Sequence, residues 1–315
     1  MVISRNPQWP ELAFSAWQET RDTLPLWTQI VGKVRLVQTP WLNHSWHVAL
    51  YVTAKGLTTS PIPHGSRVFA IEFNFLEQLL EITVTDGKTR RLPLRPQSVA
   101  DFYAAVMAAL ADLGVPTAIN ENPCELANCI PFSQDRTHVT YDPEYAHRFW
   151  QALVQVDRVL KRFRTGFTGK CSPVHFFWGS FDITVTRFSG RRAPLFTGKA
   201  PGVKPVVMQD AYSHEESSAG FWPGGNGIDY PAFYSYAYPA SPRFSEMMVQ
   251  PAGAFYSAAL GEFLLPYEVV RTAPDPDAAL LAFLQSTYEA AAIAGDWDRA
   301  ALECPLGIAG APRNP

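Results

Sequence analysis

The sequence predicts an α+β protein with mostly antiparallel sheets, built from two similar α-β-β-β-β-α halves. Apolar residues alternate with other residues over residues 69–75 and 80–84, which is the two-residue period of a half-buried strand. Asp86-Gly87 follows the second segment and is a strong signal for a two-residue hairpin, so these strands are expected to be antiparallel. Apolar stripes at helical spacing fill residues 99–113 and 145–163.

The first half is expected to begin with a helix that Pro25 breaks, because a proline ring clashes with the preceding helical turn. Apolar residues return at helical spacing from Trp27 to Val37, and a strand-like segment beginning at His47 follows a loop. After the alternating strands and the hairpin, Ser98 is expected to cap a helix that ends at Gly114.

The second half is expected to open with the clearest helix of the chain, with Asp142 as its N-cap and Pro143 as its first residue. The segment from Phe181 to Thr186 alternates, so that Asp182 and two threonines face one side of a strand and three apolar residues face the other. Further strands are predicted at AFYSYAY and GEFLLPY, and a last helix at Asp275-Pro276.

These two halves resemble one another in the order of their elements. Each has a helix with an early Trp, a loop, a strand that begins at a histidine (His47 and His175), and a Leu-Pro pair before its last helix. An ancient duplication explains this similarity, and chance similarity is the alternative, since the halves share little identity. We predict a first half over residues 1–114, a connector over 115–140, a second half over 141–303 with an inserted loop at 193–230, and a flexible tail at 304–315. One compact domain is the alternative.

Composition excludes several classes of protein. Hydrophobic residues make up 47% of the chain and charged residues 17%, which excludes disorder. A net charge of −3 gives no overall attraction to nucleic acid or to an anionic membrane, and we expect neither as a partner. The N-terminus lacks the pattern of a signal peptide, no segment is apolar enough to span a bilayer, and the four cysteines form no CxxC pair. We therefore expect a cytoplasmic protein.

The segment KCSPVHFFWGSFDITVTRFSGRR, residues 170–192, is the first candidate for a functional site. It combines a histidine, a carboxylate, several aromatic residues and flanking basic residues, which is typical of the lining of a site. HEESSAGFWPGG, residues 214–225, is the second candidate, because a histidine beside carboxylates can do acid–base work. The predicted catalytic residues are His175, His214, Glu215 and Asp182. The predicted substrate-binding residues are Lys170, Trp178, Arg187, Arg191, Trp222 and His47.

The basic residues near Lys170 favour a small anionic ligand. We expect no metal ion, because each histidine has a simpler explanation as a local hydrogen-bonding residue; the candidate ligands for a metal would be His44, His47, His175 and His214. GFTGKCS lacks the glycine spacing of a phosphate-binding loop, and no GxSxG or GxGxxG motif is found in a strand–helix context. No motif therefore identifies a cofactor or a reaction.

Long motifs that cover nearly the whole chain carry a resemblance to a known family. They include HVALYVTAKGLTTSPIPHG, GKCSPVHFFWGSFDITVTRFSGRR, SHEESSAGFWPGG and LLAFLQSTYEAA. By these motifs the chain resembles a bacterial family known only as a domain of unknown function (DUF5996). The resemblance implies a cytoplasmic bacterial protein, and it implies no activity, cofactor or catalytic residue. Three hypotheses remain: an enzyme acting on a small anionic metabolite, a non-catalytic protein that binds a small molecule, and a structural or partner-binding module. The sequence does not indicate the oligomeric state.

Overall fold

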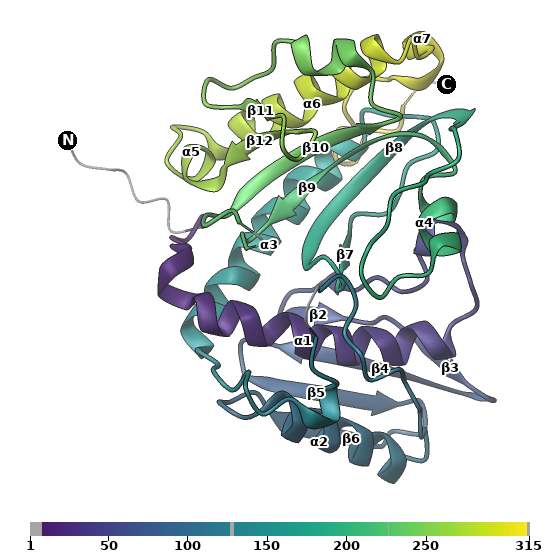
Figure 1. Cartoon of the computed structure of the whole chain (residues 1–315), viewed down its shortest axis with the longest axis vertical. Helices are drawn as coiled ribbons and strands as arrows, with labels where there is room; N and C mark the ends of the chain where they lie inside the picture. The colour runs from purple at the N-terminus through teal and green to yellow at the C-terminus, as the bar shows by residue number, and fades with distance from the viewer. Residues whose placement is uncertain (1–7, 127–128, 226, 314–315) are drawn as a thin grey trace.

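A computed structural model describes residues 8–126, 129–225 and 227–313 of the chain, and it has the α+β architecture that the sequence predicts (Figure 1). Two antiparallel sheets of six strands each form its framework. The two-sheet layout is compatible with the predicted duplication. None of the helices in these described ranges is long and apolar enough to cross a membrane.

The first helix, α1 (Phe14–Gln38), runs through Pro25 without a break, so the predicted interruption is wrong. Proline cannot donate the backbone hydrogen bond of its turn, and Thr28 donates its hydroxyl to the Pro25 carbonyl one turn later. Leu24 and Trp27 are fully buried on either side of the proline. Tertiary packing of α1 therefore outweighs the local cost of the proline.

The first sheet contains the strands of the first half in the order β1-β2-β4-β5-β6, with β3 paired to β4. Phe69, Ile71 and Phe73 alternate along β4 and are buried, and Phe73 and Trp27 of α1 both contact the Phe102 ring of α2. One face of this sheet therefore packs on α1 and α2. Its elements are β1 (Tyr51–Val52), β2 (Gly56–Thr58), β3 (Ile62–His64), β4 (Arg67–Asn74), β5 (Leu79–Val84), β6 (Thr89–Pro93) and α2 (Val99–Asp112).

The second sheet has the order β11-β12-β10-β9-β8-β7, and α3 and α6 cover one of its faces (Figure 1). The segment at 193–230, predicted as an inserted loop, contains α4 and the central strand β9, so only part of it is irregular. The elements are α3 (Pro143–Arg164), β7 (His175–Phe177), β8 (Asp182–Arg192), α4 (Pro205–Ala211), β9 (His214–Trp222), β10 (Ala232–Tyr238), β11 (Phe255–Ser257), β12 (Glu262–Pro266), α5 (Tyr267–Arg271), α6 (Pro276–Ala294) and α7 (Arg299–Leu302). Short 3-10 helices lie at Asn43–Ser45 (η1), Phe132–Gln134 (η2) and Pro242–Glu246 (η3).

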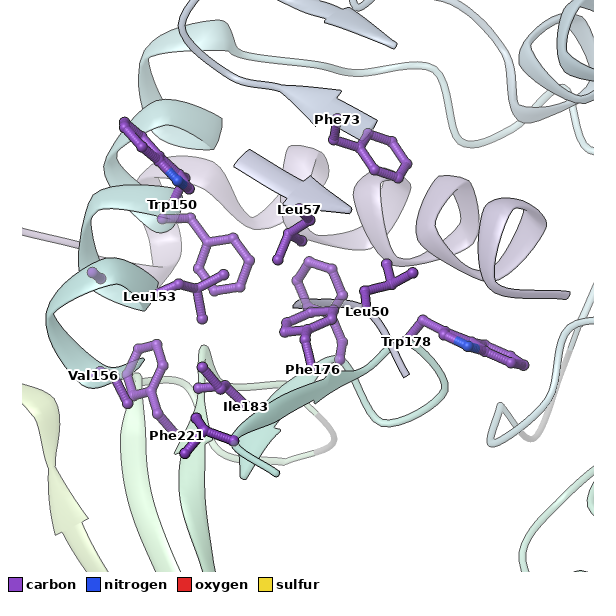
Figure 2. Packing of buried hydrophobic residues seen from close by; sticks show 14 of the residues in the cluster. Leu50, Leu57, Phe73, Trp150, Leu153, Val156, Phe176, Trp178, Ile183 and Phe221 are labelled. Atoms are coloured by element: carbon purple, nitrogen blue, oxygen red, sulfur yellow. The ribbon is translucent and has the colours of Figure 1, made fainter. Parts of the chain in front are cut away.

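The two sheets are joined by one antiparallel bridge between Leu50 and Phe176. Each residue donates its backbone N–H to the other's carbonyl at 2.8 Å. Leu50 immediately precedes β1, and Phe176 lies in the middle of β7, so the edges of the two sheets meet here. Figure 2 shows the side chains of Leu50 and Phe176 close to Leu57 of the first sheet and Ile183 of the second. A continuous cluster of buried hydrophobic residues therefore draws on both halves.

Helix α1 also contacts the β7–β8 turn of the other half. Trp178 in that turn is buried and donates its indole N–H to the Val48 carbonyl at 2.8 Å. Its ring lies against Gly32 of α1, where a Cβ atom would stand 2.2 Å from the indole. Glycine has a low helix propensity, so its presence at this position reflects the close packing against Trp178. Trp178, predicted to bind substrate, has the contacts of a core residue.

We predict that Gly32→Ala destabilises the protein although alanine favours helices. The added methyl group overlaps the Trp178 ring, and overpacking of this kind costs about 1–3 kcal/mol. Urea unfolding measures the loss. Val37→Ala, a truncation at an exposed position of the same helix, is the control and should change stability by less than about 0.5 kcal/mol. Equal stability of wild type and Gly32→Ala would contradict the packing argument.

Candidate functional site

One face of the second sheet is polar although the sheet is largely buried. On β8, Asp182, Thr184 and Thr186 point to the face opposite Ile183 and Val185, as the alternation in the sequence predicts. Thr184 lies opposite Gly220, and Thr186 lies opposite Ser218, which in turn lies opposite Tyr236 of β10. We call this surface the polar face; it consists of His175, Asp182, Thr184, Thr186, Glu216, Ser218, Tyr234 and Tyr236.

Asp182 is the centre of the polar face, and its residue is only 7% exposed. Its carboxyl group accepts hydrogen bonds from the hydroxyls of Ser180 and Tyr234. Tyr234 reaches it by lying across Gly220, where a Cβ atom would stand 2.6 Å from the phenol oxygen. None of the described basic residues forms an ion pair with Asp182. Burial therefore raises the pKa of Asp182, and the two hydroxyl donors only partly oppose this shift.

Two further carboxyl groups lie close enough to interact with Asp182. Burial and the charge of Asp182 raise the pKa of Glu125 to about 7 and that of Glu262 to about 7. Glu125 comes from the connector and has a positive φ of 61°, and its carboxyl group lies against Gly179 of the β7–β8 turn. Glu262 begins β12. Like charges brought together in this way hold protons near neutral pH.

Glu216 lies farther along the polar face, and its residue is 5% exposed. Burial raises its pKa to about 8, while the positive charge of Lys170 and a hydrogen bond with Tyr236 act in the opposite direction. The Tyr236 phenol also lies 3.4 Å from the Tyr212 phenol, and its ring stacks with that of Tyr234 at 6.2 Å. A row of tyrosines therefore connects the surroundings of Asp182 with those of Glu216.

The segment before β9 packs over the Glu216 end of the polar face. Phe196 stacks on Tyr212 with their ring centroids 4.2 Å apart, and both rings contact Tyr238 edge-on. The Tyr238 hydroxyl donates to the Pro194 carbonyl at 2.9 Å. Tyr212, Tyr234 and Tyr236 all remain only half-buried, so solvent still reaches this covered surface. The segment before β9 therefore covers this end of the polar face.

Lys170, His44 and His214 gather beyond Glu216. The Lys170 ammonium group lies 2.5 Å from Nε2 of His44, and it also lies over the rings of Phe188 and Trp46. Nδ1 of His44 contacts the Ala211 carbonyl at 2.8 Å, so this nitrogen carries the proton and Nε2 accepts from Lys170. The His214 ring lies 5.9 Å from that of His44. This group supplies the positive end of an otherwise acidic surface.

The structure separates the other predicted site residues. Arg187 points to the helix-covered face, where its guanidinium stacks over Phe163 and Tyr288. Glu215 also points away from the polar face and forms an ion pair with Arg191 at 2.7 Å. Trp222 ends β9, opposite Ala232. The polar face thus holds His175 and Asp182, with Lys170 and His214 at its edge, and it does not hold Glu215, Arg187 or Arg191.

A cavity of about 190 Å³ opens at the end of α6, beside Glu215 and Glu216. Tyr238 and the cis peptide between it and Pro239 form one wall, and Asp296 and Trp297 form another. Arg191 donates to the Gly295 and Asp296 carbonyls there. Its size is below that of most ligand sites, and Glu216 of the polar face is among its lining residues.

No group of three or more His, Cys, Asp or Glu side chains in the described ranges is arranged to hold a metal ion. His47 accepts a hydrogen bond at Nδ1 from the Leu42 backbone at 3.2 Å, and its ring packs on Trp41. His175 is 1% exposed, and burial together with Arg35 lowers its pKa to about 3. The imidazole of His175 is therefore neutral.

Sequence reasoning missed Glu125, Glu216, Tyr212, Tyr234 and Tyr236. The alternation of tyrosines in AFYSYAY was a usable signal, because three tyrosines on one strand face need polar surroundings. Glu216 stands beside Glu215, and only the strand phase decides which of the two faces the site. Glu125 gave no local signal, because its position depends on the path of the connector.

A family model described as "Family of unknown function (DUF5996)" matches residues 9–304. No curated protein and no solved structure matches this chain.

We predict that Glu216→Gln stabilises the protein at pH 8 and has little effect at pH 4.5. The folded pKa of Glu216 is about 8 and its ordinary value is 4.5, so between these values the unfolded chain releases a proton that the folded protein retains. Wild type therefore loses stability as the pH rises through this range, and the amide avoids a loss on the order of 4 kcal/mol at pH 8. Urea unfolding at both pH values measures it.

Glu81→Gln is the matched control with the opposite sign. Hydrogen bonds from Lys55 and Arg91 lower the pKa of Glu81, so its substitution should destabilise the protein at pH 8. A Glu216→Gln variant that is less stable than wild type at pH 8 would refute the raised pKa.

Proposed function

The chain belongs to the DUF5996 family of unknown function, and we propose that it is an enzyme that binds a small polar metabolite at the polar face. Asp182 is the proposed acid–base group at one end of the polar face, with Tyr234 as its hydrogen-bonding partner, and Glu216 beside Tyr236 is a second candidate at the other end. The observation that carries the proposal is the Asp182 carboxyl group, which is buried without an ion-pair partner among the described residues. Such a group costs stability, and proteins keep such groups mainly at functional sites.

The pKa directions suit proton transfer near neutral pH. Glu216, with a pKa of about 8, holds a proton at pH 7 and is suited to act as a general acid. The pKa of Asp182 is raised by burial, and two hydroxyls bind its carboxylate form, so it is the better candidate for a general base. Ile183, next to Asp182, lies opposite Phe221, five residues along β9 from Glu216, so the two carboxyl groups serve opposite ends of the polar face and do not act as a pair on one bond.

The charges near Asp182 favour an uncharged or cationic group of the ligand. Glu125 and Glu262 add negative charge when they ionise, and the aromatic rings of Tyr234 and Tyr236 are suitable for stacking or for contact with a cation. The anionic ligand expected from the sequence fits only the opposite end, where Lys170 lies. The proposed metabolite is therefore polar or hydroxyl-rich, with any anionic group directed toward Lys170 and His214.

We predict that Asp182→Asn weakens ligand binding at least tenfold, which corresponds to about 1.4 kcal/mol. A thermal-shift screen of amines, polyols, amino acids, hydroxy acids and phosphorylated metabolites at pH 7 would identify stabilising compounds for wild type. The same compounds would then be titrated against Asp182→Asn and against Glu81→Gln, whose carboxyl group lies on the other sheet. Wild type and Glu81→Gln should bind equally.

Mass spectrometry of each stabilising compound after incubation with the protein tests catalysis. Conversion that wild type and Glu81→Gln perform and Asp182→Asn does not is the expected result. A compound that binds Asp182→Asn as tightly as wild type would contradict the proposed site, and a compound that binds wild type but is recovered unchanged would contradict the enzymatic part.

A further inference from the structure

We propose that the junction of the two sheets binds a single small inorganic anion, of the size of chloride, between Arg35 of α1 and His175 of β7. This site lies on the first-half side of the polar face, and the proposal does not depend on the function proposed above. It follows from four observations: a buried cation without a counterion, a buried imidazole without partners, the strand register that brings them together, and the charges nearby.

Arg35 is a buried cation whose charge no described carboxylate neutralises. Its residue is 7% exposed, and none of the ion pairs among the described residues includes it. One guanidinium nitrogen, Nη1, donates to the Ala49 carbonyl, and the group lies 5.4 Å from the centre of the Tyr51 ring and also forms a hydrogen bond with the Tyr51 hydroxyl. Nε has no hydrogen-bonding partner. A buried guanidinium with an unused donor is costly unless something else binds it.

His175 is a second buried group without partners. Both of its ring nitrogens lack a hydrogen bond, and the residue is 1% exposed. A neutral imidazole carries one N–H donor, which an anion can accept. Burial lowers the pKa values of His175 and His47, and the positive charge of Arg35 lowers both further. These three side chains are therefore neighbours in a region with excess positive charge.

The strand register explains why Arg35 and His175 lie on the same side of the paired strands. The antiparallel bridge between Leu50 and Phe176 places Tyr51 opposite His175, on the other side of the strands from the two bridging side chains. Arg35 lies over the ring of Tyr51, so its guanidinium also lies on this side. The proposed site is thus formed by α1 and β1 from the first half and by β7 from the second.

The charges around the site favour an anion, and the burial limits its size. The acidic group that acts on His47 is Asp210, and its carboxylate already accepts from the His44 backbone at 2.9 Å. Arg35 and His175 are almost completely enclosed, so the occupant must itself be buried and small. A monatomic anion neutralises the guanidinium and accepts hydrogen bonds from Nε of Arg35 and from the His175 ring.

Arg187 shows by contrast why Arg35 is singled out. It too is buried, and its Nε and Nη1 have no partners. However, its guanidinium lies 3.5, 4.3 and 5.1 Å from the centres of three aromatic rings, belonging to Phe163, Tyr288 and Phe167. Three aromatic faces and the charge of Glu303 compensate its charge, whereas Arg35 has one ring, that of Tyr51, at a longer distance and a hydrogen bond with its hydroxyl. Arg187 is therefore a suitable control.

Bromide, a chloride substitute that scatters anomalously, is the probe. We expect crystals of the full-length protein soaked in bromide to show an anomalous peak within hydrogen-bonding distance of Arg35 Nε and a His175 ring nitrogen. We also expect the melting temperature to rise by about 2 °C when gluconate is replaced by bromide at constant ionic strength. Arg35→Met should lose this rise, and Arg187→Met should retain it.

The diffraction experiment needs no variant, so it remains decisive if Arg35→Met fails to fold. An ordered water without anomalous signal at this place would overturn the proposal. A bromide-dependent rise in melting temperature that Arg35→Met shares with wild type would also overturn it. Failure of the metabolite screen at the polar face would leave these results unchanged, because bromide binding is measured without any metabolite.

Discussion

The backbone bridge between Leu50 and Phe176 is the interaction on which the arrangement of this protein depends. Each half has its own antiparallel sheet, and the bridge joins their edges by two hydrogen bonds. Because this pairing fixes which side chains of β7 face which way, it directs Phe176 into the shared core and His175 to the opposite side. Helix α1 then packs against the junction, with Gly32 against Trp178 and Arg35 over Tyr51. Without the bridge, the first half would not lie against β7, and Arg35 would not lie on the same side of the strands as His175.

The buried carboxyl groups of the polar face lower the stability of the protein. The polar face places carboxyl groups in surroundings that raise their pKa values, and Asp182 has no ion-pair partner among the described residues. A sheet face with apolar residues at these positions would be more stable, since burial of unpaired carboxyl groups opposes folding. The large core, which runs through both halves, offsets this cost. The proposed acid–base function would account for this cost, because proton transfer near neutral pH requires carboxyl groups with raised pKa values.

Much of the fold followed from periodicity, but the composition of the site did not. Alternation correctly placed Asp182 and two threonines on one side of β8, since the two-residue period is a local property. The same reasoning treated the Ser- and Glu-rich sequence of β9 as part of a loop, because a central strand with so few large apolar residues lacks the usual pattern. The predicted helix break at Pro25 was wrong for a related reason, because burial of α1 on several sides overrides the low helix propensity of proline. Glu125, brought in by the connector, and Arg35, brought in by α1, depend on long-range packing that no local pattern encodes.

The β7–β8 hairpin connects the two proposed sites physically. His175 lies opposite Thr184 on adjacent strands, and Asp182 is the next residue of β8 on the same face, so the two are diagonal neighbours. An anion at Arg35 would reduce the positive field that now acts on His175, and it would add negative charge on the side of Asp182. Since negative charge raises the pKa of a nearby carboxyl group, the anion would favour the protonated form of Asp182. An anion bound at the junction of the two halves would therefore shift the protonation state of Asp182, a chemical effect beyond its contribution to stability.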